Sequence, residues 1–181
     1  MRRLVVMRHL SSLYSVLIAF SLSWVCSSSG EAQKEASPIP PGWRTYTDTT
    51  YRFTILYPDD FGILPEPSSL PSGAIKRVRF QDKQILSGQF AELEPSRFTI
   101  EVFKPGPASS LTEWLRSRNR LPPDAVITTV SLNGAREGVR VQRRQQLAPN
   151  EFYYFATTDY VYALIPLAEY GTKMIASFRL L

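Results

Sequence analysis

The sequence predicts an α+β fold, in which a mostly antiparallel sheet carries helices packed against it. Short stretches rich in Val, Ile, Phe and Tyr alternate with polar residues and are separated by Pro and Gly, as in half-buried strands. Two other stretches space their apolar residues as an amphipathic helix does. The resulting order of strands, helix, strands and helix is typical of α+β domains.

The first half of the folded region contains four expected strands. Each combines alternating apolar and polar residues with turn-forming residues on its flanks. These strands are Trp43–Tyr46, Tyr51–Tyr57, Ile75–Gln81 and Arg97–Phe103. The adjacent acids Asp59 and Asp60 follow Pro58, so we interpret them as a turn that closes the second strand, and not as a catalytic pair or a calcium loop. The proline-rich span Leu64–Gly73 is expected to be a loop.

A helix is expected between Ser110 and Arg120. Ser110 is a favourable N-cap, and Glu113 stands three residues later, as in a capping box. Trp114 and Leu115 contribute to an apolar face, and a Pro-Pro pair after Leu121 ends the helix.

Two hairpins and a final helix are expected in the second half. The first hairpin joins Val126–Leu132 to Gly138–Gln145 through the turn signal Asn133-Gly134. The second joins Glu151–Thr157 to Asp159–Pro166. Between Ala168 and Leu181, apolar residues recur at helical spacing, which predicts a helix that docks on the sheet.

Residues 1–25 have the features of a secretory signal peptide. Three arginines and no acidic residue lie among the first nine positions. The following apolar stretch, Leu13–Val25, is shorter than the roughly 20 residues that a membrane-spanning helix needs. We therefore expect an exported protein of the cell envelope, on the periplasmic side of a membrane; an uncleaved anchor is the alternative.

The single cysteine, Cys26, directly follows this apolar stretch and precedes Ser-Ser-Ser-Gly. This arrangement resembles a bacterial lipoprotein, in which Cys26 would carry lipid, become the mature N-terminus and anchor the chain to a membrane. The alternative is ordinary signal-peptidase cleavage after Gly30. We favour lipidation.

Residues 26–42 are polar, small and proline-rich, which predicts a disordered tether, and residues 43–181 are expected to form a single domain. The net charge of the whole chain is +5, from 21 Lys and Arg against 16 Asp and Glu. Without Arg2, Arg3 and Arg8 of the signal peptide, 18 basic residues face 16 acidic ones, which leaves +2. At this charge, the basic isoelectric point is no argument for a nucleic-acid partner.

Residue types also exclude several chemistries from the processed chain. The single histidine, His9, lies in the signal peptide, and Cys26 would be blocked by lipid. The processed chain would then have no histidine and no free cysteine, which excludes Ser-His-Asp and Cys-His catalysis, a His/Cys zinc site and an internal disulfide. No phosphate-binding glycine loop or serine-nucleophile motif occurs. We expect no enzymatic activity, no metal and no cofactor.

Basic residues in the third expected strand and in the first expected hairpin are candidates for a binding surface. These residues are Lys76, Arg77, Arg79, Arg136, Arg140, Arg143 and Arg144. If the two strands are adjacent, Lys76 and Arg140 could share a basic face that attracts acidic lipid, polysaccharide or a partner protein. Ordinary solvated strand faces are the alternative interpretation.

Aromatic residues cluster in the last hairpin, at Phe152–Phe155, Tyr160 and Tyr162. They could form a stacking platform for sugar or nucleic acid. We favour core packing, because successive strand residues face opposite sides of a sheet that is covered on both faces.

Several motifs along the folded region form a recognisable set. They are the early Tyr-x-Phe-x-Ile-x-Tyr-Pro-x-x-Phe at Tyr51–Phe61, the SLTEWL helix at Ser110–Leu115, Leu132-Asn133-Gly134, the aromatic strands at Phe152–Phe155 and Asp159–Leu164, and Met174–Leu181. Together they resemble the Mog1/PsbP-like superfamily, including its small bacterial envelope lipoproteins. The resemblance implies an α/β/α sandwich around an antiparallel sheet. It also implies a binding or assembly factor, because members of the family act mostly on larger complexes. It supplies no active-site motif.

These observations lead to one expected function. We expect a non-enzymatic, secreted and lipid-anchored envelope protein that acts by binding an unidentified envelope partner or assisting complex assembly. A His/Cys-independent hydrolase that uses carboxylates is one alternative, and a structural or stress-related envelope lipoprotein is another.

Overall fold

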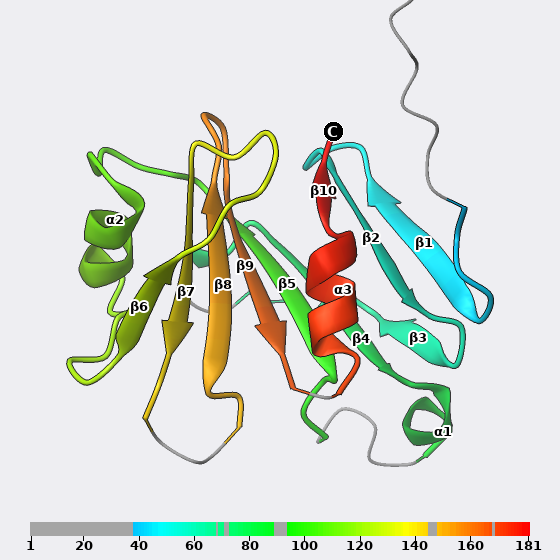
Figure 1. Cartoon of the computed structure of the whole chain (residues 1–181). Coiled ribbons are helices and arrows are strands. Elements are labelled where there is room, and N and C mark those ends of the chain that lie inside the picture. Colours follow the sequence, from blue (N-terminus) through cyan, green and yellow to red (C-terminus); the bar gives the residue numbers. More distant parts are fainter. Residues whose placement is uncertain (1–37, 68, 71–72, 89–93, 145–147, 168) are drawn as a thin grey trace, which may run out of the picture. The chain divides into compact units, whose positions relative to one another are not determined.

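The computed structural model describes residues 38–181, except residues 68, 71–72, 89–93, 145–147 and 168. The expected signal peptide and Cys26 therefore lie outside the described residues. Ser37–Leu181 make up one compact unit, and the strands described in it form two antiparallel sheets (Figure 1). No helix in this described part is long and apolar enough to cross a membrane.

The smaller sheet is built from the two ends of this unit. β1 (Trp43–Asp48) and β2 (Phe53–Pro58) form a hairpin in which Trp43 pairs with Pro58 and Asp48 with Phe53. The last strand, β10 (Arg179–Leu180), adds to the free edge of β2. Main-chain hydrogen bonds thus hold together the first and last strands of this unit, through β2 between them.

The larger sheet contains all the other described strands, and each neighbouring pair is antiparallel. Its strands, in spatial order, are β3 (Phe61–Leu64), β4 (Lys76–Asp82), β5 (Phe98–Phe103), β9 (Val161–Pro166), β8 (Glu151–Ala156), β7 (Glu137–Gln142) and β6 (Val126–Thr129). Both expected hairpins, β6–β7 and β8–β9, are present. The predicted fold class is confirmed.

Helices cover both faces of the larger sheet. α2 (Leu111–Ser117) packs on β7 and β8, and α3 (Gly171–Ser177) packs against β9 and β2. The layer that contains α3 also includes the smaller sheet, a feature that the expected α/β/α sandwich did not include. The reason is that Phe178 is extended, with ψ of 131°, so the chain leaves the helix there and pairs with β2. The expected final helix is therefore shorter than the span 168–181.

The N-terminus of α2 forms one of the two hydrogen bonds that a capping box predicts. The Ser110 hydroxyl accepts a hydrogen bond from the Glu113 N–H at 3.2 Å. The Glu113 carboxylate, however, accepts from the N–H and hydroxyl of Ser109, at 2.9 and 2.6 Å, and not from Ser110. The Glu113 carboxylate thus binds the main-chain N–H of the residue before the N-cap, whereas a capping box would bind the N–H of the N-cap residue itself.

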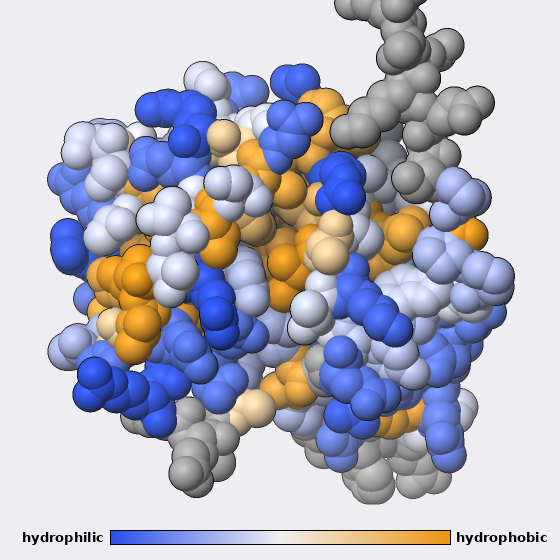
Figure 2. Space-filling view, in the orientation of Figure 1, coloured by the Kyte–Doolittle hydropathy of each residue, from blue (hydrophilic) through white to orange (hydrophobic). Residues whose placement is uncertain are grey.

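Two hydrophobic clusters lie on opposite faces of the larger sheet. Phe152 and Tyr154 point into the cluster under α2, whereas Phe155 points into the cluster shared with the smaller sheet. The aromatic residues of β8 are therefore largely core, as the alternation predicts. At the outer edge, β6 leaves Val126 and Ile127 46% and 39% exposed, and Figure 2 shows hydrophobic atoms gathered over this strand.

The buried phenol of Tyr162 should make the fold sensitive to alkaline pH. Its side chain is 1% exposed, its hydroxyl donates to the Tyr51 carbonyl at 2.8 Å, and burial raises its pKa to about 12. A folded-state pKa above the ordinary value of 10 means that the stabilisation is complete below pH 10 and is lost as the pH rises toward 12. We expect the free energy of unfolding, measured with urea, to fall across this range.

Tyr162→Phe should reduce the slope of that fall. Part of the slope should remain, because burial and Asp48 also raise the pKa of Tyr46 to about 12. An identical pH dependence in Tyr162→Phe and the unmodified protein would contradict the assignment.

Candidate functional site: a cavity at one end of the sheets

A cavity of about 340 Å³ lies where several turns meet. Its walls come from the β1–β2 turn, the β6–β7 loop, the β8–β9 turn and the end of β10, all at the upper end of the unit in Figure 1. Antiparallel hairpins bring these segments together, because each turn lies at an end of its strands. The cavity is a binding-site candidate of the size usual for ligand pockets.

Main-chain and hydroxyl hydrogen bonds define the shape of the β8–β9 turn. The Thr157 N–H donates to the Tyr160 carbonyl at 2.8 Å. The Thr157 hydroxyl accepts from the N–H groups of Asp159 and Tyr160, at 3.3 and 3.1 Å. This turn leaves Thr158 and Asp159 exposed at the cavity.

The opposite wall is the turn at Asn133-Gly134. Gly134 has φ of +84°, a conformation that favours glycine, and the Ala135 N–H donates to the Leu132 carbonyl at 3.1 Å. An added Cβ would lie 3.5 Å from the Leu180 Cβ, an ordinary van der Waals contact, so the positive φ and not a lack of space is the reason for glycine here. The exposed amide of Asn133 lies at the rim of this wall.

Arg52 occupies an unfavourable backbone conformation at the edge of the cavity. Its φ is +56°, in the left-handed region that costs a residue with a Cβ roughly 1 kcal/mol or more. Its carbonyl accepts from the Leu181 N–H at 2.9 Å. Its guanidinium pairs with Asp159 at 3.9 Å, with both side chains about 60% exposed. Such a long, exposed ion pair contributes little stability.

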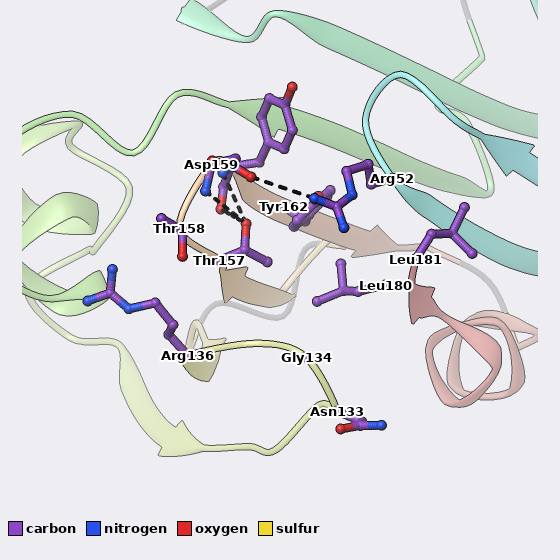
Figure 3. Close-up of a pocket in the computed structure, with 11 residues that line it drawn as sticks. Arg52, Asn133, Gly134, Arg136, Thr157, Thr158, Asp159, Tyr162, Leu180 and Leu181 are labelled. Carbon is purple, nitrogen blue, oxygen red and sulfur yellow. Dashed lines mark hydrogen bonds and ion pairs between the residues drawn. The ribbon is translucent and has the colours of Figure 1, made fainter. Parts of the chain in front are cut away.

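Arg136 lies on the other side of the β8–β9 turn (Figure 3). It is exposed, and its main-chain N–H donates to the Ala156 carbonyl at 2.7 Å. Among the described residues, no acidic side chain pairs with its guanidinium. Arg136 therefore supplies an uncompensated positive charge to the cavity.

The seven basic residues that the sequence indicated do not form one continuous strand face. β5, β9 and β8 lie between β4 and β7, so Lys76 and Arg140 are not on adjacent strands. Arg77 and Arg79 point to the face opposite Lys76, since strand residues alternate. The condition for a shared basic face of Lys76 and Arg140 is not met.

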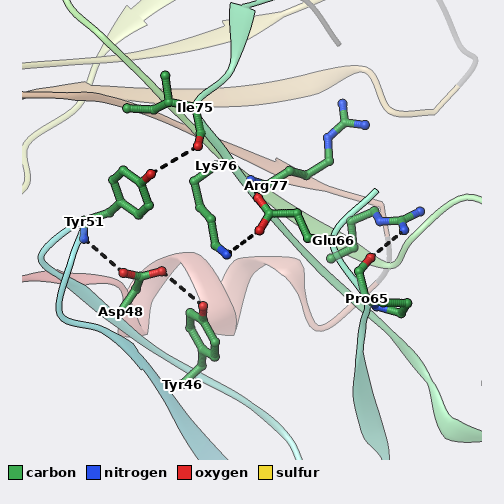
Figure 4. Close-up of polar contacts among 9 residues, drawn as sticks. Tyr46, Asp48, Tyr51, Pro65, Glu66, Ile75, Lys76 and Arg77 are labelled. Carbon is green, nitrogen blue, oxygen red and sulfur yellow. Dashed lines mark hydrogen bonds and ion pairs between the residues drawn. The ribbon is translucent and has the colours of Figure 1, made fainter. Parts of the chain in front are cut away.

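Most of these basic side chains already have a partner. Lys76 pairs with Glu66 at 2.7 Å, and an Arg79 N–H donates to the Pro65 carbonyl at 3.0 Å (Figure 4). The other contacts are Arg77 with Glu101, Arg140 with Glu151, and Arg143 over the Phe152 ring at 4.7 Å. Arg144 is exposed, next to residues that are not described. Arg136 is thus the member of the set that meets the cavity.

The acidic residues that the structure describes show no arrangement for a metal ion. Asp59 and Asp60 are exposed in the turn that the sequence predicted, between β2 and β3. Asp48 instead accepts from the Tyr46 hydroxyl and the Tyr51 N–H, at 3.2 and 2.9 Å (Figure 4). Within the described residues, no cluster of three or more His, Cys, Asp and Glu could hold a metal.

No protein-family model matches this chain, and no curated protein matches it either. Solved structures do. One is the solution structure of cyanobacterial PsbP (CyanoP) from Synechocystis sp. PCC 6803, with a TM-score of 0.47 and 13% identical residues. The match covers 81% of this chain and 96% of that chain.

Sequence reasoning did not find most of the cavity. Arg136 was indicated by its charge, whereas Arg52 was read as part of a strand, and Asn133 and Thr158 as turn residues. The signals for these residues were weak, because an exposed arginine or a threonine in a turn is common in any domain. A positive φ at Arg52 cannot be read from the sequence.

We expect Arg52→Gly to stabilise the protein although it removes an ion pair. Glycine adopts positive φ without a steric cost, and the lost pair with Asp159 is exposed and long. The expected gain is about 0.5 to 1 kcal/mol in the free energy of unfolding, measured by urea denaturation. Arg44→Gly on β1, an exposed position without positive φ, should destabilise instead. Equal losses in the two variants would show that Arg52 is unstrained.

Proposed function

We propose that this protein is an exported envelope protein, anchored by lipid on Cys26, whose folded unit binds a partner protein without catalysis. Residues 26–42 are the proposed tether, and the cavity is the proposed recognition site. One observation carries the proposal: Arg52, Arg136, Asn133 and Thr158, whose side chains carry hydrogen-bond donors, line one cavity of about 340 Å³ that is open to solvent. A rim of exposed polar groups around a recess suits recognition of a protein segment.

The chemistry of the cavity favours binding over catalysis. A hydrolase that relies on carboxylates needs an acid and a base. Among the described residues that line the cavity, Asp159 is the single acidic side chain, and it is paired with Arg52. The remaining polar groups there are hydroxyls, an amide and guanidiniums, which can orient a ligand, and no second carboxylate side chain among the described lining residues completes an acid–base pair with Asp159.

The proposed anchor is tested by metabolic labelling of cells with a fatty-acid probe. The unmodified protein should take up the label and fractionate with membranes, whereas Cys26→Ala should lose the label. Labelled Cys26→Ala protein would contradict anchoring at this residue.

The proposed recognition site is tested by photo-crosslinking in intact cells. A photoreactive amino acid at Thr158, which lines the cavity, should capture a defined partner protein. The matched control is Thr172 on α3, another exposed threonine, which lies outside the cavity and should not capture it. Capture of the same proteins from both positions, or of none from Thr158, would contradict the cavity as the recognition site.

A further inference from the structure

The ion pair between Arg52 and Asp159 leaves most of the bonding capacity of Arg52 free. The nitrogen–oxygen distance of 3.9 Å is about 1 Å longer than a strong charge-assisted hydrogen bond. A guanidinium has five N–H donors, and the side chain is 61% exposed. A carboxylate from a ligand can therefore bind Arg52 in a bidentate geometry at the cost of a weak internal contact.

Arg136 provides a second binding position for an anion. Its charge is uncompensated among the described residues, in contrast to Arg77 and Arg140, which pair with Glu101 and Glu151. The side chains of the described lining comprise two guanidiniums and one carboxylate, a net side-chain charge of +1. Two exposed guanidiniums at one cavity, one of them without an acidic partner among the described residues, favour a ligand that carries carboxylates.

The positions of the two arginines indicate the shape of the ligand. Figure 3 shows Arg52 and Arg136 on opposite sides of the Thr157–Asp159 turn, with the Thr158 side chain between them. A single small anion can bind one of them, whereas an extended chain with spaced carboxylates can reach both. Hydroxyl and amide groups of Thr158 and Asn133 are available to the main chain of such a ligand.

We infer that the cavity binds an extended acidic peptide segment of the partner, with one carboxylate on Arg52 and another on Arg136. This inference rests on the proposed function, since it specifies the chemistry of the partner at the same cavity. Arg52 presents its guanidinium at the cavity from a backbone with φ of +56°, a conformation in which glycine would be favoured.

The test uses the full-length protein in detergent micelles and a fluorescent, acetylated and amidated peptide of alternating Gly and Glu. We expect saturable binding by fluorescence anisotropy, and none with the matched Gly and Gln peptide. Arg52→Gln and Arg136→Gln should each lower the affinity about tenfold, the usual loss for a charge-assisted hydrogen bond. Arg116→Gln, an exposed arginine on α2 outside the cavity, changes the net charge equally and should leave the affinity within about twofold.

Two results would overturn the inference. If Arg116→Gln weakens binding as much as Arg136→Gln, the peptide is attracted by net charge and not by the cavity. If inorganic phosphate or oligogalacturonate competes at lower concentration than the unlabelled Glu peptide, the ligand is a different anion. A partner captured at Thr158 together with absent Glu-peptide binding would retain the proposed function and reject its acidic ligand. Binding of the Glu peptide at the cavity without capture of any protein at Thr158 would instead reject the proposed partner protein.

Discussion

Glu101→Gln is expected to lower the free energy of unfolding by about 3 kcal/mol, because it removes the anion from a buried group of three charges. Glu101 on β5 is 2% exposed and pairs with Arg77 on β4 and with Arg120 after α2, the latter at 3.1 Å. Arg120 also lies over the Phe103 ring at 4.3 Å. Without the carboxylate, two largely buried guanidiniums would face each other without compensation.

Urea denaturation of the purified protein measures this loss, and two further variants define its cause. Glu66→Gln removes the partner of Lys76 at a more exposed pair and should cost at most about 1 kcal/mol. Replacing Arg77 and Arg120 by Met together with Glu101→Leu should recover most of the stability, because an apolar group of similar volume avoids the desolvation of charges. An unchanged unfolding midpoint in Glu101→Gln would show that the three charges are solvated.

Phe178→Ala is expected to cost about 3 to 5 kcal/mol, the usual range for a buried Phe→Ala substitution. The Phe178 ring is 0% exposed and lies 5.6 Å from Phe53, 6.2 Å from Phe155 and 5.7 Å from Tyr162, between ring centroids. Phe53 belongs to the smaller sheet, and Phe155 and Tyr162 belong to the larger one. The substitution therefore opens a cavity at the contact that joins the sheets.

The measurement is again the free energy of unfolding in urea. Ile63→Thr on β3 is the control, since it changes a β-branched residue that is 40% exposed, and it should stay within about 0.5 kcal/mol. A loss below 1 kcal/mol in Phe178→Ala would mean that the two sheets do not depend on this ring for their association.

Much of the fold follows from local sequence patterns. Alternation in Phe152–Phe155 predicted which rings enter the core, and the turn signals Asn133-Gly134 and Thr158-Asp159 predicted both hairpins. Strand β3 and helix α1 (Lys83–Leu86) were not predicted, because each has four residues and too few apolar positions to show a period. The end of α3 was misplaced because helical spacing continues through Phe178, which is nevertheless extended.

The candidate site was less predictable than the fold. Arg52, Asn133 and Thr158 come from separate turns, and each turn is polar for local reasons that need no ligand. The predicted basic surface depended on the adjacency of two strands, and alternation within a strand carries no information about its neighbour.

The sequence by itself determined the fold class, both hairpins, helix α2 and the inward-facing aromatic residues of β8, and it led to an expectation of export and lipidation. It did so because alternation, caps and turn residues act over a few neighbouring positions. The tertiary structure alone decided that β5, β9 and β8 separate Lys76 from Arg140, and that Arg52 and Arg136 line one cavity. The physical reason is that strand order is set by long-range pairing and packing. The charge of a residue can therefore be read from the sequence, whereas the residue that it pairs with depends on the strand order.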